Sequence, residues 1–214
     1  KEFYWRQNGK KFDNNSRQGD NPALQISPTD NGLVSIIYVS KPSIIKYKDF
    51  SKFQNFVMEK HSPNVVEIHK NLDFPLENFS EIYTRYSKAL VGVGTSKGFD
   101  TENNLELELV ALENPYTDNM ADGIEILALY NGNPRAFSNL NVFERSNTDS
   151  SVNTFVVKTN GKGVAVVEVN NDCTYLIDNV IIRPANKKLF KDRGVIWESL
   201  WAALTFSVIR SNGI

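Results

Sequence analysis

The chain has 214 residues, of which 41 % are hydrophobic, and its 24 lysines and arginines nearly balance its 25 aspartates and glutamates. This composition is sufficient for a hydrophobic core, and a net charge of −1 provides no electrostatic basis for binding nucleic acid or an anionic membrane surface. No segment approaches the roughly 20 apolar residues that a transmembrane helix needs. We therefore expect a soluble globular protein with no transmembrane segment and no nucleic-acid partner.

The first part of the chain, residues 1–98, predicts a small α+β portion. Residues 1–32 are rich in Asn, Gln, Gly and Asp and show little hydrophobic periodicity, so no regular element is predicted there. A β-branched run predicts a strand at 33–39, and a second strand at 43–47 is expected to pair with it.

A helix is predicted directly after these strands. Asp49 resembles a helix N-cap, because Phe50, Phe53 and Phe56 follow it at three-to-four spacing. The segment 75–90 fits a helix and an extended strand equally well, since its apolar residues follow a 3.6-residue period while its tyrosines and its β-like end also suit a strand. Both interpretations stay open for that segment.

From residue 105 onward the hydrophobic period changes to two, which predicts a β-sandwich over residues 99–214. About seven strands are expected, the number that an immunoglobulin-like or transthyretin-like sandwich uses. The predicted strands lie at 105–109, 124–130, 140–145, 152–159, 164–169, 174–182 and 201–209. The fold class is therefore mainly β, with an immunoglobulin-like sandwich that follows the N-terminal α+β portion.

Several segments share their order with a known family. Together they resemble the exported bacterial family of unknown function 4198, some members of which are described as NikM-like components of nickel uptake. The matching segments lie at 38–42, 50–56, 83–94, 107–109, 114–116, 132–134, 159–163 and 197–206.

The resemblance implies a periplasmic or otherwise exported bacterial protein with an immunoglobulin-like sandwich. It also implies a part in handling a divalent transition metal, with a membrane transporter or an outer-membrane receptor as partner. Family members often begin His-Glu-Phe-Trp, which can chelate a metal, whereas this chain begins at Lys1 with Lys-Glu-Phe-Tyr-Trp. This departure removes the obvious metal ligand, unless residues upstream have been lost. Any targeting peptide is expected to have been removed.

The two histidines, His61 and His69, are the candidate metal ligands. Pro63 separates them, and neither has a second His or Cys at ligand spacing, so ordinary hydrogen-bonded histidines are favoured over a chelating pair. Cys173 is the only cysteine, which excludes an intramolecular disulfide, and its acidic surroundings predict a structural thiol.

Catalytic motifs are not found in the sequence. It contains no Gly-x-Ser-x-Gly elbow, phosphate-binding loop or dinucleotide fingerprint, which predicts that the protein is not an enzyme. Glu106 and Glu108 could form a carboxylate pair, but a solvated strand face opposite the leucines is favoured. Glu108 is also expected to pair with a cation such as Arg85 or Lys88.

Aromatic residues provide the remaining candidates for a binding site. Trp197 and Trp201 lie four apart in a predicted β region, so both indoles should point to one face. They can form a binding wall or seal the edge of the sandwich, and sealing is favoured. Arg85 and Lys88, with their neighbouring tyrosines, can recognise an anionic ligand or form a contact between domains.

These observations predict a non-catalytic exported binding protein, with an accessory role in transition-metal uptake implied by the resemblance alone. The alternative is a structural or interaction module of the bacterial envelope, which binds a protein partner and no small ligand. The candidate binding residues are Arg85, Lys88, Glu108, Trp197 and Trp201, and the candidate metal ligands are His61 and His69.

Overall fold

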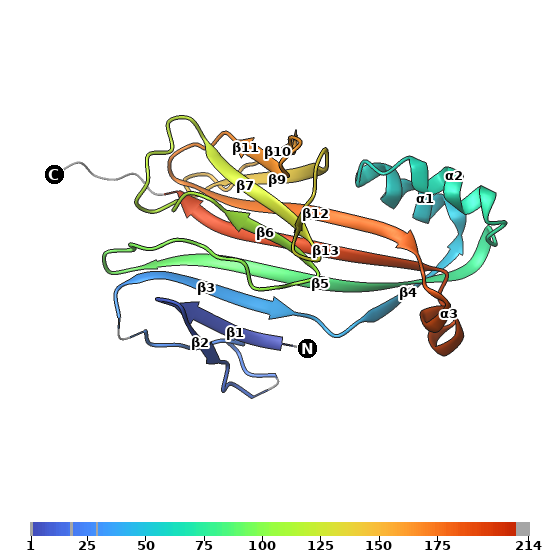
Figure 1. Cartoon of the computed structure of the whole chain (residues 1–214), viewed down its shortest axis with the longest axis horizontal. Helices are drawn as coiled ribbons and strands as arrows, with labels where there is room; N and C mark the ends of the chain where they lie inside the picture. Colours follow the sequence, from blue (N-terminus) through green and yellow to red (C-terminus); the bar gives the residue numbers. More distant parts are fainter. Residues whose placement is uncertain (1, 18, 29, 209–214) are drawn as a thin grey trace.

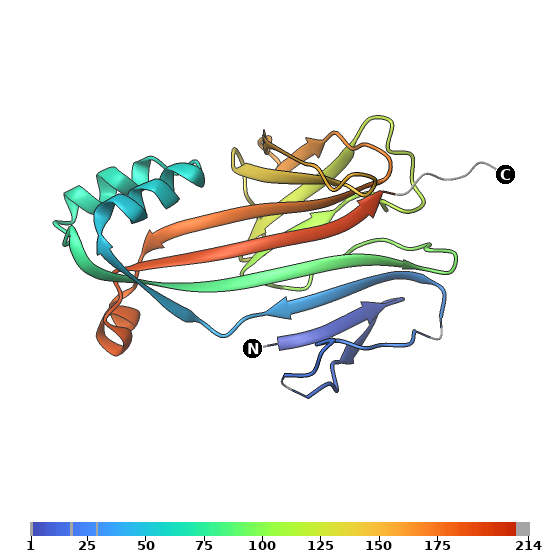
Figure 2. The ribbon, with the colours of Figure 1, turned by 180° about the vertical axis from the view of Figure 1, so that it is seen from behind.

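The computed structural model describes residues 2–17, 19–28 and 30–208. Within these residues the chain forms a mainly β protein with two open sheets and three short helices (Figures 1 and 2). The predictions that involve Lys1 and Ile209 fall outside the described residues. None of the described helices is long and apolar enough to cross a membrane.

The larger sheet has nine strands, in the order β10-β9-β12-β13-β5-β3-β1-β2, with β4 also paired to β5. All neighbours are antiparallel except β13 and β5, which run parallel. The strands are β1 (Glu2–Gln7), β2 (Lys10–Asp13), β3 (Gly32–Val39), β4 (Ser43–Asp49), β5 (Glu77–Val93), β9 (Asn139–Ser146), β10 (Val152–Lys158), β12 (Cys173–Pro184) and β13 (Trp197–Val208).

The smaller sheet has four strands, in the order β11-β7-β6, with β8 paired to β7. These strands are β6 (Leu107–Ala111), β7 (Ile124–Tyr130), β8 (Asn133–Pro134) and β11 (Val164–Val167). One core cluster joins the two sheets, since Leu107 and Ile126 of the smaller sheet pack with Ile177 and Leu204 of the larger one. The smaller sheet therefore covers one face of the larger sheet.

The other face of the larger sheet is covered at one end by α1 (Phe50–Glu59) and α2 (Asn64–Asn71). Alternate residues of β13 show this division, because Leu200 and Leu204 join the core between the sheets whereas Trp197 packs with the helices. Figures 1 and 2 show the helices at one end of the long strands and the smaller sheet at the other. The third helix, α3 (Lys187–Arg193), connects β12 to β13.

The predicted strands at 33–39 and 124–130 and the helix after Asp49 are confirmed. The ambiguous segment 75–90 is extended, as part of the 17-residue strand β5. Five elements were not predicted: β1, β2, β8, α2 and α3. The last strand also starts earlier than predicted, at Trp197.

The two predicted portions share one sheet and one core. Strand β5 pairs with β3 on one side and with β13 on the other, so strands from both sides of residue 98 are neighbours. The core between the sheets likewise combines Ile37 and Leu90 with Ile126 and Leu204. The division into 1–98 and 99–214 stays a prediction about the organisation of the sequence.

Candidate ligand-binding groove

A groove of about 500 Å³ lies where α1 meets strands β4, β5 and β13. It combines aromatic walls with a basic rim. The aromatic residues are Tyr47, Phe56, Tyr83 and Trp201, the basic residues are Lys46, Lys52 and Arg85, and Ile45 and Glu81 complete the lining. Two of the residues singled out in the sequence, Arg85 and Trp201, are therefore brought together here.

Arg85 is held in place by two aromatic rings. In the parallel pairing of β5 and β13 it lies opposite Trp201. Its guanidinium carbon lies 5.5 Å from the ring centroid of Tyr83 and 5.4 Å from that of Trp201, within the range of a cation–π contact. No carboxylate of the described residues lies within ion-pair distance of Arg85. Its charge is thus oriented by the rings and is not neutralised by a carboxylate in direct contact.

The indole of Trp201 is fixed on several sides. It stacks on Phe56 with a centroid separation of 5.4 Å and an interplanar angle of 13°, and the ammonium of Lys60 lies 5.0 Å from its ring. Its Nε1–H donates to Oγ of Ser199 at 2.9 Å, and the Ser199 hydroxyl in turn donates to Glu81. The wall that Trp201 forms is therefore rigid.

Glu81 is the buried anchor of this arrangement, with 2 % of its surface exposed. Its second carboxylate oxygen accepts a hydrogen bond of 2.7 Å from the hydroxyl of Tyr47. Burial raises the pKa of Glu81, while the bonds from Ser199 and Tyr47 act in the opposite direction. Because both oxygens are already engaged by hydroxyls, we assign Glu81 the role of positioning the groove walls.

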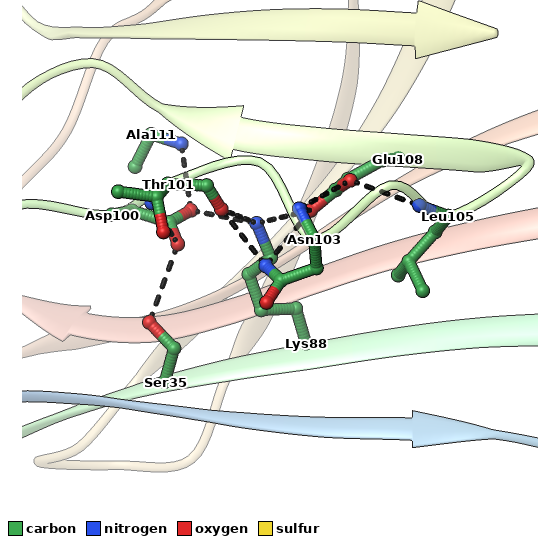
Figure 3. Close-up of polar contacts among 8 residues, drawn as sticks. All are labelled: Ser35, Lys88, Asp100, Thr101, Asn103, Leu105, Glu108 and Ala111. Atoms are coloured by element: carbon green, nitrogen blue, oxygen red, sulfur yellow. Dashed lines mark hydrogen bonds and ion pairs between the residues drawn. The ribbon is translucent and has the colours of Figure 1, made fainter. Parts of the chain in front are cut away.

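Lys88 and Glu108 lie elsewhere, in a buried polar network on the opposite face of β5 from Arg85 (Figure 3). The Lys88 ammonium is 3.0 Å from Oδ2 of Asp100 and 2.9 Å from Oε1 of Glu108, and each of these side chains is at most 2 % exposed. Glu108 also accepts hydrogen bonds from both the backbone and the side chain of Asn103. Burial is the main factor that raises the pKa of Asp100, and Lys88 opposes it.

The predicted pairing of Glu108 with Lys88 is confirmed, but the predicted solvated face is wrong for Glu108, which is buried, whereas Glu106 is partly exposed and pairs with Arg183. The loop after β5 folds over this face of β6 and supplies Asp100 and Asn103, as Figure 3 shows. The two-residue alternation indicates which face a side chain occupies, but it does not indicate whether a loop covers that face. Lys88 and Glu108 thus form a structural contact between β5 and β6 that solvent does not reach.

Trp197 and His69 meet in the core between α2 and the larger sheet. Both are fully buried, and the Trp197 indole N–H donates to Nδ1 of His69 at 3.0 Å. Nε2 of His69 therefore carries the ring proton, which it donates to the Pro75 carbonyl at 3.1 Å. Burial lowers the pKa of His69, which favours the neutral ring. Trp197 seals this core, and both nitrogens of His69 are engaged.

His61 follows α1 as an exposed residue with a positive φ of 53° and is not part of the core that contains His69. Across the described ranges, no three His, Cys, Asp or Glu side chains are grouped so as to hold a metal ion. Cys173 is buried, and burial raises the pKa of its thiol, in keeping with a structural residue.

Sequence reasoning missed Tyr47 and Glu81 in the groove lining and Ser199, which links Glu81 to Trp201. A signal for Glu81 was present, because a strand at 75–90 places Glu81, Tyr83 and Arg85 on one face by alternation. The equally good helical interpretation of that segment obscured it.

Comparison with known proteins identifies the chain only at the level of a family. No curated protein and no solved structure matches it. Residues 2–182, from β1 into β12, match the family described as "Domain of unknown function (DUF4198)". This match spans most of the sequence, and the chain therefore belongs to the DUF4198 family.

Proposed function

We propose that this protein is a non-catalytic, exported binding protein of the bacterial envelope and that the groove beside α1 is its binding site. The observation that carries the proposal is Arg85, which two aromatic rings orient and which contacts no carboxylate of the described residues. Small-molecule sites commonly combine apolar walls with a few oriented polar groups. The groove has this composition, and Glu81, the one carboxylate among the described residues that line it, is held by two hydroxyls.

An accessory role in transition-metal uptake, with a membrane transporter or outer-membrane receptor as partner, is the physiological part of the proposal. Its support is the resemblance of the sequence to NikM-like members of the family. Because His69 is engaged on both nitrogens, a metal cargo of the nickel or cobalt type would bring ligands of its own. Thermal melts with nickel citrate, nickel ion and citrate separate these cases, since a ligand that binds the native state raises the melting temperature. The role predicts a rise with the complex that nickel ion does not reproduce.

The finer fold assignment belongs to the same proposal. We infer that the smaller sheet and strands β9, β10, β12 and β13 form a distant variant of the immunoglobulin-like sandwich. The face-to-face packing of antiparallel strands around one core supports this. The parallel pairing of β13 with β5 departs from that pattern.

The rival function is a structural or interaction module that binds a protein partner. Its specific support is the part of the larger sheet that continues beyond Trp201 on the helix side. Residues Ser87, Ala89, Ala203 and Thr205 are only partly buried there and carry no charge, and Leu176 beside them is 40 % exposed. A sheet face of this kind suits contact with another protein.

Native mass spectrometry after incubation with a deproteinised bacterial extract tests the small-ligand function. The full chain should retain one small molecule, and Trp201→Leu should lose it. Arg145→Gln is the control, because Arg145 is exposed on β9, which β12 and β13 separate from β5. An extract that leaves no adduct, or an adduct that Trp201→Leu retains, would overturn the groove as the binding site.

A further inference from the structure

We propose that the groove selects a small anion with a flat apolar body, whose charge is bound by Arg85 and Lys52 and whose body lies against the aromatic walls. This inference rests on the proposed function, because it names the class of ligand that the groove takes. It is carried by three features of the groove: its charge, the orientation of Arg85 and its aromatic lining.

The first feature is a local excess of positive charge. The whole chain has a net charge of −1, yet the described residues that line the groove include three cationic residues and one acidic residue, Glu81. Lys52 and Arg85 supply the charge on the Glu81 side, because Lys46 pairs with Ser80 and lies on the other face of the sheet. Among the described residues, neither Lys46 nor Arg85 has a carboxylate within 4.0 Å, whereas Lys52 interacts with the exposed carboxylate of Asp49, whose pKa is lowered chiefly by a hydrogen bond from Ser51 and also by Lys52. Glu81 lies inward and is bonded to Tyr47 and Ser199. The rim therefore attracts anions and repels cations.

The second feature is the orientation of Arg85 before any ligand arrives. Its guanidinium lies 5.5 Å and 5.4 Å from the centroids of two rings, and these cation–π contacts favour this orientation. A planar guanidinium can donate two parallel hydrogen bonds to a carboxylate, and a group that is already ordered loses less entropy on binding. A carboxylate or a similar planar oxyanion is thus the best match for Arg85.

The third feature is the aromatic lining, which a bare ion would leave uncovered. Phe56, Tyr83 and Trp201 line the groove beside Arg85, with Phe56 stacked on Trp201, and a hydrogen bond joins the Trp201 indole to Ser199. Flat apolar molecules gain free energy by covering such rings, because the rings and the ligand both lose contact with water. The volume of about 500 Å³ suits a molecule with one or two rings.

Titration with a matched set of probes tests the inference. The probes are 2-naphthoate as the anion, 2-naphthylmethylamine as the cation, 2-naphthalenemethanol as the neutral molecule and sulfate as the bare anion. Binding to the full chain is measured by isothermal titration calorimetry at low salt, with circular dichroism to confirm that each variant is folded. We expect 2-naphthoate to bind most tightly, and raising the salt to about 0.5 M to weaken its binding several-fold.

Two substitutions separate the contribution of the Arg85 charge to binding from that of the aromatic rings. Arg85→Gln should weaken 2-naphthoate about tenfold, the loss expected for one charge-assisted hydrogen bond, and should leave the neutral probe unchanged. Trp201→Leu should weaken both probes. Arg145→Gln also removes one positive charge, from the exposed surface of β9, and should leave the binding of both probes unchanged. Because the Arg85 side chain is exposed, Arg85→Gln is expected to fold even if Trp201→Leu does not.

Different results would contradict the ligand class and the groove as a binding site. If the neutral or the cationic probe binds as tightly as 2-naphthoate in a manner that requires Trp201, the anion class is wrong and the groove remains a binding site. Unchanged binding of 2-naphthoate to Arg85→Gln also overturns the anion class. If no probe binds and the bacterial extract yields no adduct that depends on Trp201, the proposed function itself is wrong.

Discussion

The buried network around Lys88 makes a strong prediction about stability. Lys88→Met keeps an unbranched side chain of similar length but removes the only cation that contacts Asp100 and Glu108 within the described part of the chain. The two carboxylates are 0 % and 2 % exposed, so water cannot replace the ammonium without rearrangement of the loop above them. The substitution therefore leaves two buried negative charges side by side.

The size of the effect follows from the bonds that remain. Breaking a buried ion pair by removal of one partner costs about 3–5 kcal/mol. Asp100 keeps hydrogen bonds from Thr101 and Ala111, and Glu108 keeps those from Asn103, so a value of about 4 kcal/mol is expected at pH 7.5. For a chain of this length that loss lowers the melting temperature by about 8–16 °C.

Urea unfolding at two pH values measures the effect, with Lys158→Met on the exposed edge strand β10 as the control. Burial already raises the pKa of Asp100 in the wild type, and the loss of Lys88, which opposes that rise, raises it further. A carboxyl group with a raised pKa stabilises the fold at low pH and loses that contribution as pH rises. The deficit of Lys88→Met should therefore be smaller at pH 5 than at pH 7.5. A deficit below 1 kcal/mol at pH 7.5, or one that grows toward pH 5, would show that Lys88 does not neutralise the buried carboxylates in this way.

Three further substitutions test other contacts. Burial raises the pKa of Glu81, so the free energy of unfolding of the wild type should fall relative to that of Glu81→Gln as pH rises from about 4.5 to 7.5. A difference that stays constant with pH in urea unfolding would contradict this. Trp197→Phe removes the hydrogen bond to His69 and part of a buried ring, which should lower the free energy of unfolding by about 2–4 kcal/mol; a change below 1 kcal/mol would count against it. Lys60→Met breaks the 3.0 Å ion pair that joins the end of α1 to Asp178 and should lower the free energy of unfolding by about 1–3 kcal/mol. An unchanged urea unfolding curve would show that the pair does not stabilise the fold.

Local sequence patterns located many of the strands but not every element. The β-branched run at 33–39 and the strand at 124–130 were predictable because their patterns depend only on neighbouring residues. Helix α2 is only eight residues long and contains the β-branched pair Val65 and Val66, so its pattern was too short and too mixed to recognise.

The candidate groove depends on contacts between residues that are far apart in the sequence. The parallel pairing of β5 with β13 places residues 81–89 beside 197–205 and brings Arg85 next to Trp201. Both residues were candidates in the sequence for separate reasons, yet no local pattern indicates that they are neighbours. Only the tertiary fold decides such a pairing, because the connection between these strands contains the whole of the smaller sheet.

A crystal structure of the protein with 2-naphthoate tests the central claim most directly. We expect the carboxylate to contact the guanidinium of Arg85 and the naphthalene ring to lie in the groove against Tyr83 or Trp201. A probe bound at another surface, with the groove beside α1 empty, would contradict it.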